Sequence, residues 1–445
     1  MTGSVEVGCW GWPEQTGISP PLLAQPVTDA AARQLLGDFR PLIGPLDPPP
    51  RAVSADPHLL AEASRGLPPG PAQAEAIAAR LRRRGKALVW GPAEPIGSLA
   101  ELEEVNAARG ASSVDMLRAD PDIVAWMQVG SWWHCGWKVR ALRRMPTAAA
   151  AGPARRGAIW RLRADLAFWS GVRRAATPRE WAWLTGSYVV FSYHRLAGEG
   201  RRDQDQIDIS PRRFGAQLRM LRLLGYRPLT IEELLCFHTE PGMPLGRRRY
   251  LVTSDDGFED NKGPLEHHRG SEPVLFVPTA AIGAAATWAA GEHVLRWDEL
   301  AAMHSVGVTI GSHGRRHASL PLLDTERLVD ELSGSRADLM AHLPGRADAI
   351  AYPHGHHDAR TLRAVAEAGY RVGFTTSPGR NGAGTHLLCL RRVGIWRRDR
   401  LPLFLWKALT GEYAPGQSRT EGAGWVTAVR RARRRDRPPR HDAAA

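Results

Sequence analysis

Strands and helices alternate in a regular order from Ser187 onward, and this alternation restricts the fold more than any other feature of the chain. Runs of β-branched and aromatic residues predict strands, and amphipathic segments between most of them predict helices. The predicted strands are 188–194, 250–254, 274–277, 308–311, 349–352, 371–375 and 387–395. The predicted helices begin at Ser210, Thr230, Trp297, Asp324 and Asp358, and the fourth extends to about residue 343. This order is typical of a largely parallel α/β sheet or barrel.

The predicted strand Tyr250–Ser254 ends at two adjacent acids, Asp255 and Asp256, which are followed by Gly257. Chemistry in α/β proteins usually lies at the carboxyl ends of strands, and neighbouring side chains that leave a strand point in different directions. The two acids can therefore hold different roles. A structural turn, in which the aspartates bond to the local backbone, is the alternative interpretation of the same residues.

Two histidines four residues apart, His313 and His317, follow the predicted strand at 308–311. If their turn is helical, both imidazoles lie on one face, as binding of a divalent metal requires. Two histidines and one carboxylate form a ligand set that leaves positions open for water and substrate. Asp255 or Asp256 can supply that carboxylate, and the other acid then remains free to accept a proton.

Taken together, these motifs resemble the polysaccharide deacetylase family, also called the NodB-homology or carbohydrate esterase family 4 domain. Its Thr-Phe-Asp-Asp-Gly motif corresponds to residues 253–257, its His-(Ser/Thr)-x-x-His motif to 313–317, and its aromatic-Pro-x-Gly turn to 352–355. The resemblance covers about residues 187–400, roughly half of the chain. The joint match is specific, whereas any one of the motifs alone is not.

The resemblance implies a distorted (β/α) barrel with fewer strands than a full TIM barrel. It implies that Asp255 is the general base and that Asp256, His313 and His317 bind zinc or another divalent metal. Such a metal polarises the carbonyl of an N-acetyl group and lowers the pKa of bound water. The implied enzyme is a metal-dependent hydrolase that removes acetyl groups from N-acetylhexosamine-containing saccharides.

The pair Tyr193-His194 resembles the branch of the family that begins with a Tyr-His strand. The resemblance then implies that His194 is the general acid. It also implies that the backbone N–H of Tyr352 helps to hold the oxyanion. Arg392 is assigned either to the substrate and oxyanion side of the site or to the orientation of the base.

Three features depart from the family pattern. Ser254 replaces the usual phenylalanine, which predicts altered packing behind the base. Ala351 stands where many members have the arginine that orients the base, and Arg392 is the residue that can serve instead. Arg315 and Arg316 lie inside the histidine motif, where they either contact an anionic substrate or are exposed to solvent.

The other parts of the chain contain no motif that identifies a reaction. Residues 1–150 are predicted to be a mostly helical region of unknown function, whose cluster Trp132–Trp137 is more typical of a core than of a ligand site. Residues 151–186 are predicted to be a linker with amphipathic helices that dock between domains or lie on a membrane. Residues 187–400 are the predicted catalytic domain, and 401–445 a basic, partly disordered tail.

Composition and charge restrict the partners. The formal net charge of +13 is carried mainly by arginine in local runs, which are usually solvated surfaces, so no nucleic acid is expected. No stretch is typical of an export signal or a membrane span. We therefore expect a cytoplasmic protein, with at most peripheral membrane contact, that acts on a soluble or lipid-linked sugar precursor.

Two alternative functions stay open at this point. A catalytically impaired relative would bind carbohydrate without releasing acetate. A nucleic-acid binder would use the basic tail, and its affinity would depend steeply on salt concentration.

Overall fold

The computed structural model describes residues 62–83, 99–133, 137–144, 156–197, 208–289 and 291–414. The chain divides into two compact units. Unit 1 comprises residues 1–188, 229–249 and 380–386, and unit 2 comprises 189–228, 250–379 and 387–445. The predictions for residues 1–61, 134–136, 145–155 and 415–445 lie outside the described residues. The domain boundaries at residues 150, 186 and 400 stay predictions.

The described part of unit 1 is mainly helical. Its helices are α3 (Gln73–Arg83), α4 (Leu99–Ala119), α5 (Trp137–Leu142), α6 (Arg156–Ala175), α7 (Pro178–Thr185) and α9 (Ile231–Thr239), with short 3-10 turns at Pro121–Trp126 and Gln128–Trp133. Helices α4 and α6 approach closely because glycines lie at their contact. A Cβ atom on Gly110 would lie 2.0 Å from the carbonyl oxygen of Phe168, so any larger residue there would separate the two helices.

Tryptophans form the core of unit 1. The side chains of Trp132, Trp169 and Trp183 are fully buried, and the rings of Trp132 and Trp169 meet edge to face at 4.8 Å. The structure confirms a core position for Trp132. Helix α6 buries Leu166, Trp169 and Val172 inside the unit, which favours docking within the protein over the membrane-surface alternative for this helix.

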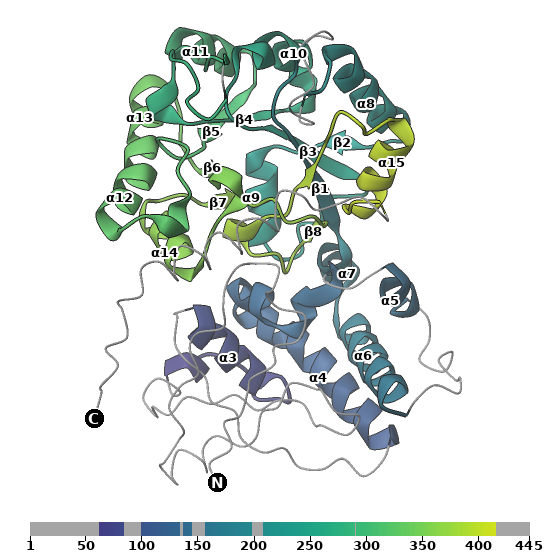
Figure 1. Cartoon of the computed structure of the whole chain (residues 1–445). Helices are drawn as coiled ribbons and strands as arrows, with labels where there is room; N and C mark the ends of the chain where they lie inside the picture. Colours follow the sequence, from purple (N-terminus) through teal and green to yellow (C-terminus); the bar gives the residue numbers. More distant parts are fainter. Residues whose placement is uncertain are drawn as a thin grey trace, which may run out of the picture. The chain divides into compact units, whose positions relative to one another are not determined.

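Unit 2 contains most of the sheet (Figure 1). The strands are β1 (Ser187–Tyr193), β2 (Arg227–Pro228), β3 (Arg249–Ser254), β4 (Val274–Val277), β5 (Thr309–Ser312), β6 (Ala349–Ala351), β7 (Val372–Phe374), β8 (Asn381–Gly382) and β9 (Val393–Gly394). The main order is β7-β6-β5-β4-β3-β1-β8, with β2 beside β3 and β9 beside β1. All pairs from β3 to β7 are parallel, so their carboxyl ends lie at one edge.

The segment 390–395 connects the two sides of this curled sheet. Leu390 pairs with Phe374 of β7, and β9 pairs in parallel with Phe191 and Ser192 of β1. Its backbone donates from Leu390 to Gly373 and from Ile395 to Ser192, at 2.8 and 2.9 Å. The α/β sheet therefore curls into a distorted (β/α) barrel, as the resemblance to the family implied.

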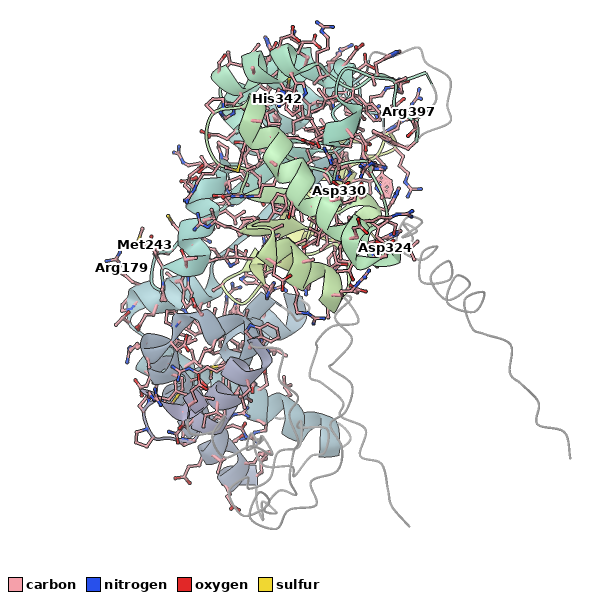
Figure 2. The ribbon with its side chains drawn as sticks, turned by 90° about the vertical axis from the view of Figure 1, so that its left-hand side faces the viewer. Arg179, Met243, Asp324, Asp330, His342 and Arg397 are labelled. Carbon is pink, nitrogen blue, oxygen red and sulfur yellow. The ribbon has the colours of Figure 1, made fainter. Side chains whose placement is uncertain are left out.

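Helices surround the strands of unit 2 in Figure 1. They are α8 (Pro211–Leu223), α10 (Lys262–His267), α11 (Trp297–Ser305), α12 (Thr325–Val329), α13 (Ser335–His342), α14 (Ala359–Glu367) and α15 (Leu401–Thr410). The predicted helix from Asp324 is one continuous rod in Figure 2, but a π turn at Asp330–Gly334 separates α12 from α13. The sequence pattern gave no signal for this turn.

Two boundaries differ from the prediction. Residues Leu387–Cys389 of the predicted last strand form a 3-10 turn, in which the carbonyl oxygen of Leu388 accepts a hydrogen bond from the Tyr352 hydroxyl. The first residues of the predicted tail form α15, which buries Phe404 and Ala408. Among the described residues, no helix has the length and hydropathy needed to cross a bilayer.

Candidate active site

The two acids after β3 are buried, and a sharp turn separates their directions. Asp255 is 2% exposed and Asp256 is 5% exposed. Asp256 and Gly257 both have left-handed backbone conformations, with φ of 74° and 67°. A Cβ atom at Gly257 would lie 2.7 Å from a methyl group of Val277, so glycine is required there by both conformation and space.

Arg392 binds Asp255 in a bidentate manner. Its Nη1 and Nη2 atoms donate to the two carboxylate oxygens at 2.6 and 2.7 Å, and its Nε donates to the carbonyl oxygen of Thr375 at 2.9 Å. The guanidinium is fully buried. All three of its nitrogens are therefore used inside the barrel, and the assignment of Arg392 to the substrate and oxyanion side is wrong. Its geometry is that of a residue that orients the carboxylate of Asp255.

This ion pair keeps Asp255 ionised. Burial by itself raises the pKa of a carboxyl group. Here the charge of Arg392, with contributions from His313 and His194, outweighs burial and holds the pKa of Asp255 well below its usual range. At neutral pH the side chain is a carboxylate that can accept a proton.

The loop that carries His313 and His317 is not helical, which corrects the geometry expected for this pair. Gly314 and His317 have left-handed φ values of 74° and 59°. The loop nevertheless brings the two imidazole centroids to 4.9 Å from each other. It also brings Nε2 of His317 and Nε2 of His313 to 3.2 and 3.7 Å from Oδ1 of Asp256.

Asp256, His313 and His317 have the chemistry of a metal site. One ligand atom from each lies within 4.8 Å of the others. Nδ1 of His313 lies 2.8 Å from the carbonyl oxygen of Ala351, so Nδ1 carries the proton and Nε2 keeps its lone pair. Oδ1 of Asp256 is buried and accepts no hydrogen bond from a described residue. An unpaired carboxylate oxygen that faces two imidazole nitrogens fits a divalent cation.

The pKa values of these groups agree with that ligand set. Burial lowers the pKa of His313 to about 4, so its imidazole is neutral at pH 7. Burial acts on Asp256 in the opposite direction, but His317, His194 and His313 together hold the pKa of this carboxyl below its usual value. A neutral imidazole and an ionised carboxylate are the forms that bind a metal.

Residue 194 lies beside the two acids, at the end of β1. His194 is close enough to lower the pKa values of Asp255 and Asp256. Its carbonyl oxygen accepts hydrogen bonds from the Ser254 hydroxyl at 2.9 Å and from Nδ2 of Asn261 at 2.8 Å. The substitution at Ser254 therefore has a polar consequence that packing arguments did not predict. Asn261, which also contacts Ser254, carried no predicted role.

The backbone N–H of Tyr352 is not available to an oxyanion, which corrects that expectation. It donates to the carbonyl oxygen of Phe374 at 3.0 Å, as part of the pairing between the ends of β6 and β7. The side chain of Tyr352 is fully buried. In the turn that follows, the N–H groups of Gly355 and His356 donate to the carbonyl oxygens of Tyr352 and Pro353, at 2.8 and 3.1 Å. The ring of His354 lies 4.7 Å from that of His317.

A further aromatic residue, Trp288, lies against the site. Its ring stacks on His317 at a centroid distance of 4.5 Å and an interplanar angle of 22°. The sequence gave no signal for it, because the segment around it has no regular periodicity.

Two histidines after the turn at residues 352–355 are not part of the metal-type cluster, the name used here for Asp256, His313 and His317. They are His356, which contacts the Ser319 hydroxyl at 2.8 Å, and His357.

Comparisons with known proteins find similar polysaccharide deacetylases. Residues 253–373 match the family model described as polysaccharide deacetylase. A putative polysaccharide deacetylase of Bacillus subtilis, YxkH, is 26% identical over 211 residues, which are 46% of this chain and 70% of that protein.

Two solved structures are also similar to this chain. A putative polysaccharide deacetylase of Bacillus anthracis has 23% identity and a TM-score of 0.42, with 49% of this chain and 68% of that one covered. The deacetylase PplD of Streptococcus pyogenes, solved with acetate, has 21% identity and a TM-score of 0.44. There, 49% of this chain and 97% of that one are covered.

The carboxylate pair and the two histidines lie at the carboxyl ends of the strands of a (β/α) barrel, the face at which such barrels hold their active sites. The match over residues 253–373 contains the acids and both histidines of the site. Residues 253–373 are therefore identified as a region of the polysaccharide deacetylase family, and the enzyme class of the chain is that of a deacetylase.

Proposed function

We propose that this chain is a metal-dependent N-deacetylase that removes acetyl groups from N-acetylhexosamine-containing saccharides. One observation carries the proposal. A buried, ionised Asp255 lies next to Asp256, whose free carboxylate oxygen faces His313 and His317. Hydrolysis of an amide needs a base, an oxyanion stabiliser and an acid for the leaving amine, and the residues around Asp255 can supply all three.

We assign the ligand positions to Asp256, His313 and His317, with zinc as the preferred metal because imidazole and carboxylate ligands suit it. When bound, a divalent cation supplies Lewis-acid polarisation of an amide carbonyl and of water. Asp255 accepts the proton that the attacking water loses. His194 donates a proton to the departing amine, and the products are acetate and the free amino sugar.

Removal of the metal should abolish activity. With N-acetylglucosamine oligomers as substrate, chelation should lower acetate release at least about a hundredfold, since metal catalysis contributes several kcal/mol. Addition of Zn²⁺ should restore the wild type but not His313→Ala. Full acetate release by a metal-free protein would contradict the proposal. A protein that binds the oligomers and metal without releasing acetate would instead be the impaired, carbohydrate-binding relative.

His194→Ala should affect amide and activated ester substrates differently. An amine leaves only with a proton, whereas a nitrophenolate leaves without one. We expect release of acetate from an N-acetylated sugar to fall about a hundredfold or more, and hydrolysis of nitrophenyl acetate to change far less. An equal loss on both substrates would show that His194 is not the general acid. His356→Ala is a suitable control, because His356 lies outside the metal-type cluster.

The sugar itself can be identified with a substrate panel. The panel should contain N-acetylglucosamine oligomers, a peptidoglycan fragment and a lipid-linked N-acetylated sugar, each assayed with and without chelator. The highest kcat/KM identifies the class of substrate. A preference for the lipid-linked sugar would support the peripheral membrane contact expected from the sequence.

A further inference from the structure

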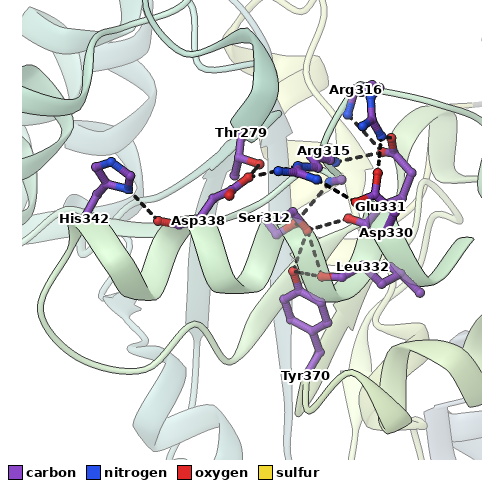
Figure 3. Close-up of polar contacts among 12 residues, drawn as sticks. Thr279, Ser312, Arg315, Arg316, Asp330, Glu331, Leu332, Asp338, His342 and Tyr370 are labelled. Atoms are coloured by element: carbon purple, nitrogen blue, oxygen red, sulfur yellow. Dashed lines mark hydrogen bonds and ion pairs between the residues drawn. The ribbon is translucent and has the colours of Figure 1, made fainter. Parts of the chain in front are cut away.

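A buried acid outside the predicted site, Glu331, binds the backbone of the loop that carries the two histidines. Glu331 is 2% exposed and lies on the π turn Asp330–Gly334 (Figure 3). Its Oε2 accepts hydrogen bonds from the backbone N–H groups of Arg315 and Arg316 at 2.7 and 2.9 Å. These two residues lie between His313 and His317, so the carboxylate binds the middle of the loop.

Other contacts fix the rest of this loop. The N–H of His313 donates to Val277, and that of Gly314 donates to the Ser312 hydroxyl. The carbonyl oxygens of Gly314 and Arg315 accept from Thr279 and Ala280 of the neighbouring loop. Glu331 thus supplies the acceptor for the backbone N–H groups of Arg315 and Arg316 in this loop.

The conformation of the loop explains why it needs this support. His317 is a non-glycine residue at φ 59°, a backbone conformation that costs free energy and persists only where the surroundings hold it. Gly314 occupies the position at which the resembling family usually has serine or threonine. A Cβ atom on Gly314 would lie 3.1 Å from Oε2 of Glu331, so in this chain the carboxylate occupies the space beside that position.

The neighbouring acids have a different function. Asp330 binds the guanidinium groups of Arg315 and Arg316, each at 2.6 Å, and Asp338 binds Nε of Arg315 at 3.2 Å (Figure 3). Both arginine side chains are therefore paired within the fold. This pairing does not support the anionic-substrate contact that the sequence left open. Asp330 touches only side chains of the loop, whereas Glu331 also binds its backbone.

We propose that Glu331 is a positioning residue that sets the geometry of the metal site through the backbone of residues 315 and 316. This role rests on the proposed metal-dependent function. Residues that do not bind the metal but orient its ligands typically contribute about tenfold to a hundredfold to metal affinity. Glu331 does not touch the ligands, so its contribution acts on the placement of His317 relative to Asp256 and His313.

Metal affinity of the full-length protein tests this role without an activity assay. We expect Glu331→Met, which keeps the side-chain volume but lacks an acceptor, to weaken Zn²⁺ binding about tenfold to a hundredfold in a chelator competition. Its Co²⁺ absorption spectrum should also change, because the ligand geometry changes. Glu331→Gln retains an acceptor oxygen and should bind more tightly than Glu331→Met. Asp330→Asn is the matched control and should bind Zn²⁺ like the wild type.

Three results would overturn the proposal. In the first, Glu331→Met binds Zn²⁺ and gives a Co²⁺ spectrum like the wild type. In the second, Asp330→Asn weakens binding as much as Glu331→Met. In the third, the wild type itself binds no metal, which removes the proposed function as well and so differs from a failure of Glu331 alone. If Glu331→Met does not fold, Glu331→Gln takes its place: it exchanges the charged acceptor for a weaker neutral one and should bind Zn²⁺ less tightly than Asp330→Asn.

Discussion

Asp255→Asn should lower acetate release about a hundredfold to ten-thousandfold, the usual contribution of a general base, while metal affinity stays close to that of the wild type. Asparagine has nearly the same shape but cannot accept the proton from water. The residues assigned to the metal, Asp256, His313 and His317, are not changed by the substitution. Loss of activity without loss of metal would separate the role of the base from that of the ligands.

The matched control is Asp256→Asn, at the adjacent position. Its carboxylate oxygen faces His313 and His317 rather than Arg392. We expect this variant to lose metal affinity and acetate release together. Both quantities are measured on the same preparations, by chelator competition and by acetate detection. If Asp255→Asn kept most of the activity, or lost metal as Asp256→Asn does, the division of roles between the two acids would be wrong.

Arg392→Met should destabilise the protein strongly, because it leaves the carboxylate of Asp255 buried without its partner. Removal of one member of a buried ion pair typically costs about 3–5 kcal/mol of folding free energy. The pair here is fully buried and bidentate, with both distances below 2.8 Å. The free energy of unfolding, obtained from denaturant titration near pH 7, measures the effect. The double variant Asp255→Asn/Arg392→Met should recover part of the loss, because no unpaired charge remains.

The pH dependence of Arg392→Met follows from the pKa of Asp255. In the wild type this pKa is held below the ordinary value of 3.8 by Arg392 and nearby histidines, against burial. The ion pair therefore adds stability above about pH 4 that is lost as pH falls through the folded-state pKa. Without Arg392, burial dominates and raises the pKa of Asp255. In the pH profile of kcat/KM, the limb at acidic pH should therefore move to higher pH. An unchanged acidic limb would show that Arg392 does not control the pKa of Asp255.

The sequence by itself determined the α/β order of elements and the candidate residues Asp255, Asp256, His313 and His317, whereas the choice of Asp256 over Asp255 as ligand came from the resemblance to the family. Strands β3, β4 and β5 lie within two residues of their predicted ranges, because short apolar runs between turn signals fix both their type and their place. Parallel strands bring their carboxyl ends to one edge, so acids and histidines that follow such strands meet there. Asp255, Asp256, His313 and His317 could thus be found from their positions after strands.

Only the tertiary structure decided how each group is oriented and held. Asp255 pairs with Arg392, which lies on the segment that pairs with both β7 and β1. No local sequence pattern predicts that this segment joins the two strands. The N–H of Tyr352 is used in pairing with β7, which sequence spacing cannot show. Glu331 reaches the histidine loop from a π turn within a continuous helix, and periodicity alone predicts a regular helix there. Hydrogen-bond partners far apart in sequence depend on packing, so they appear only in the folded chain.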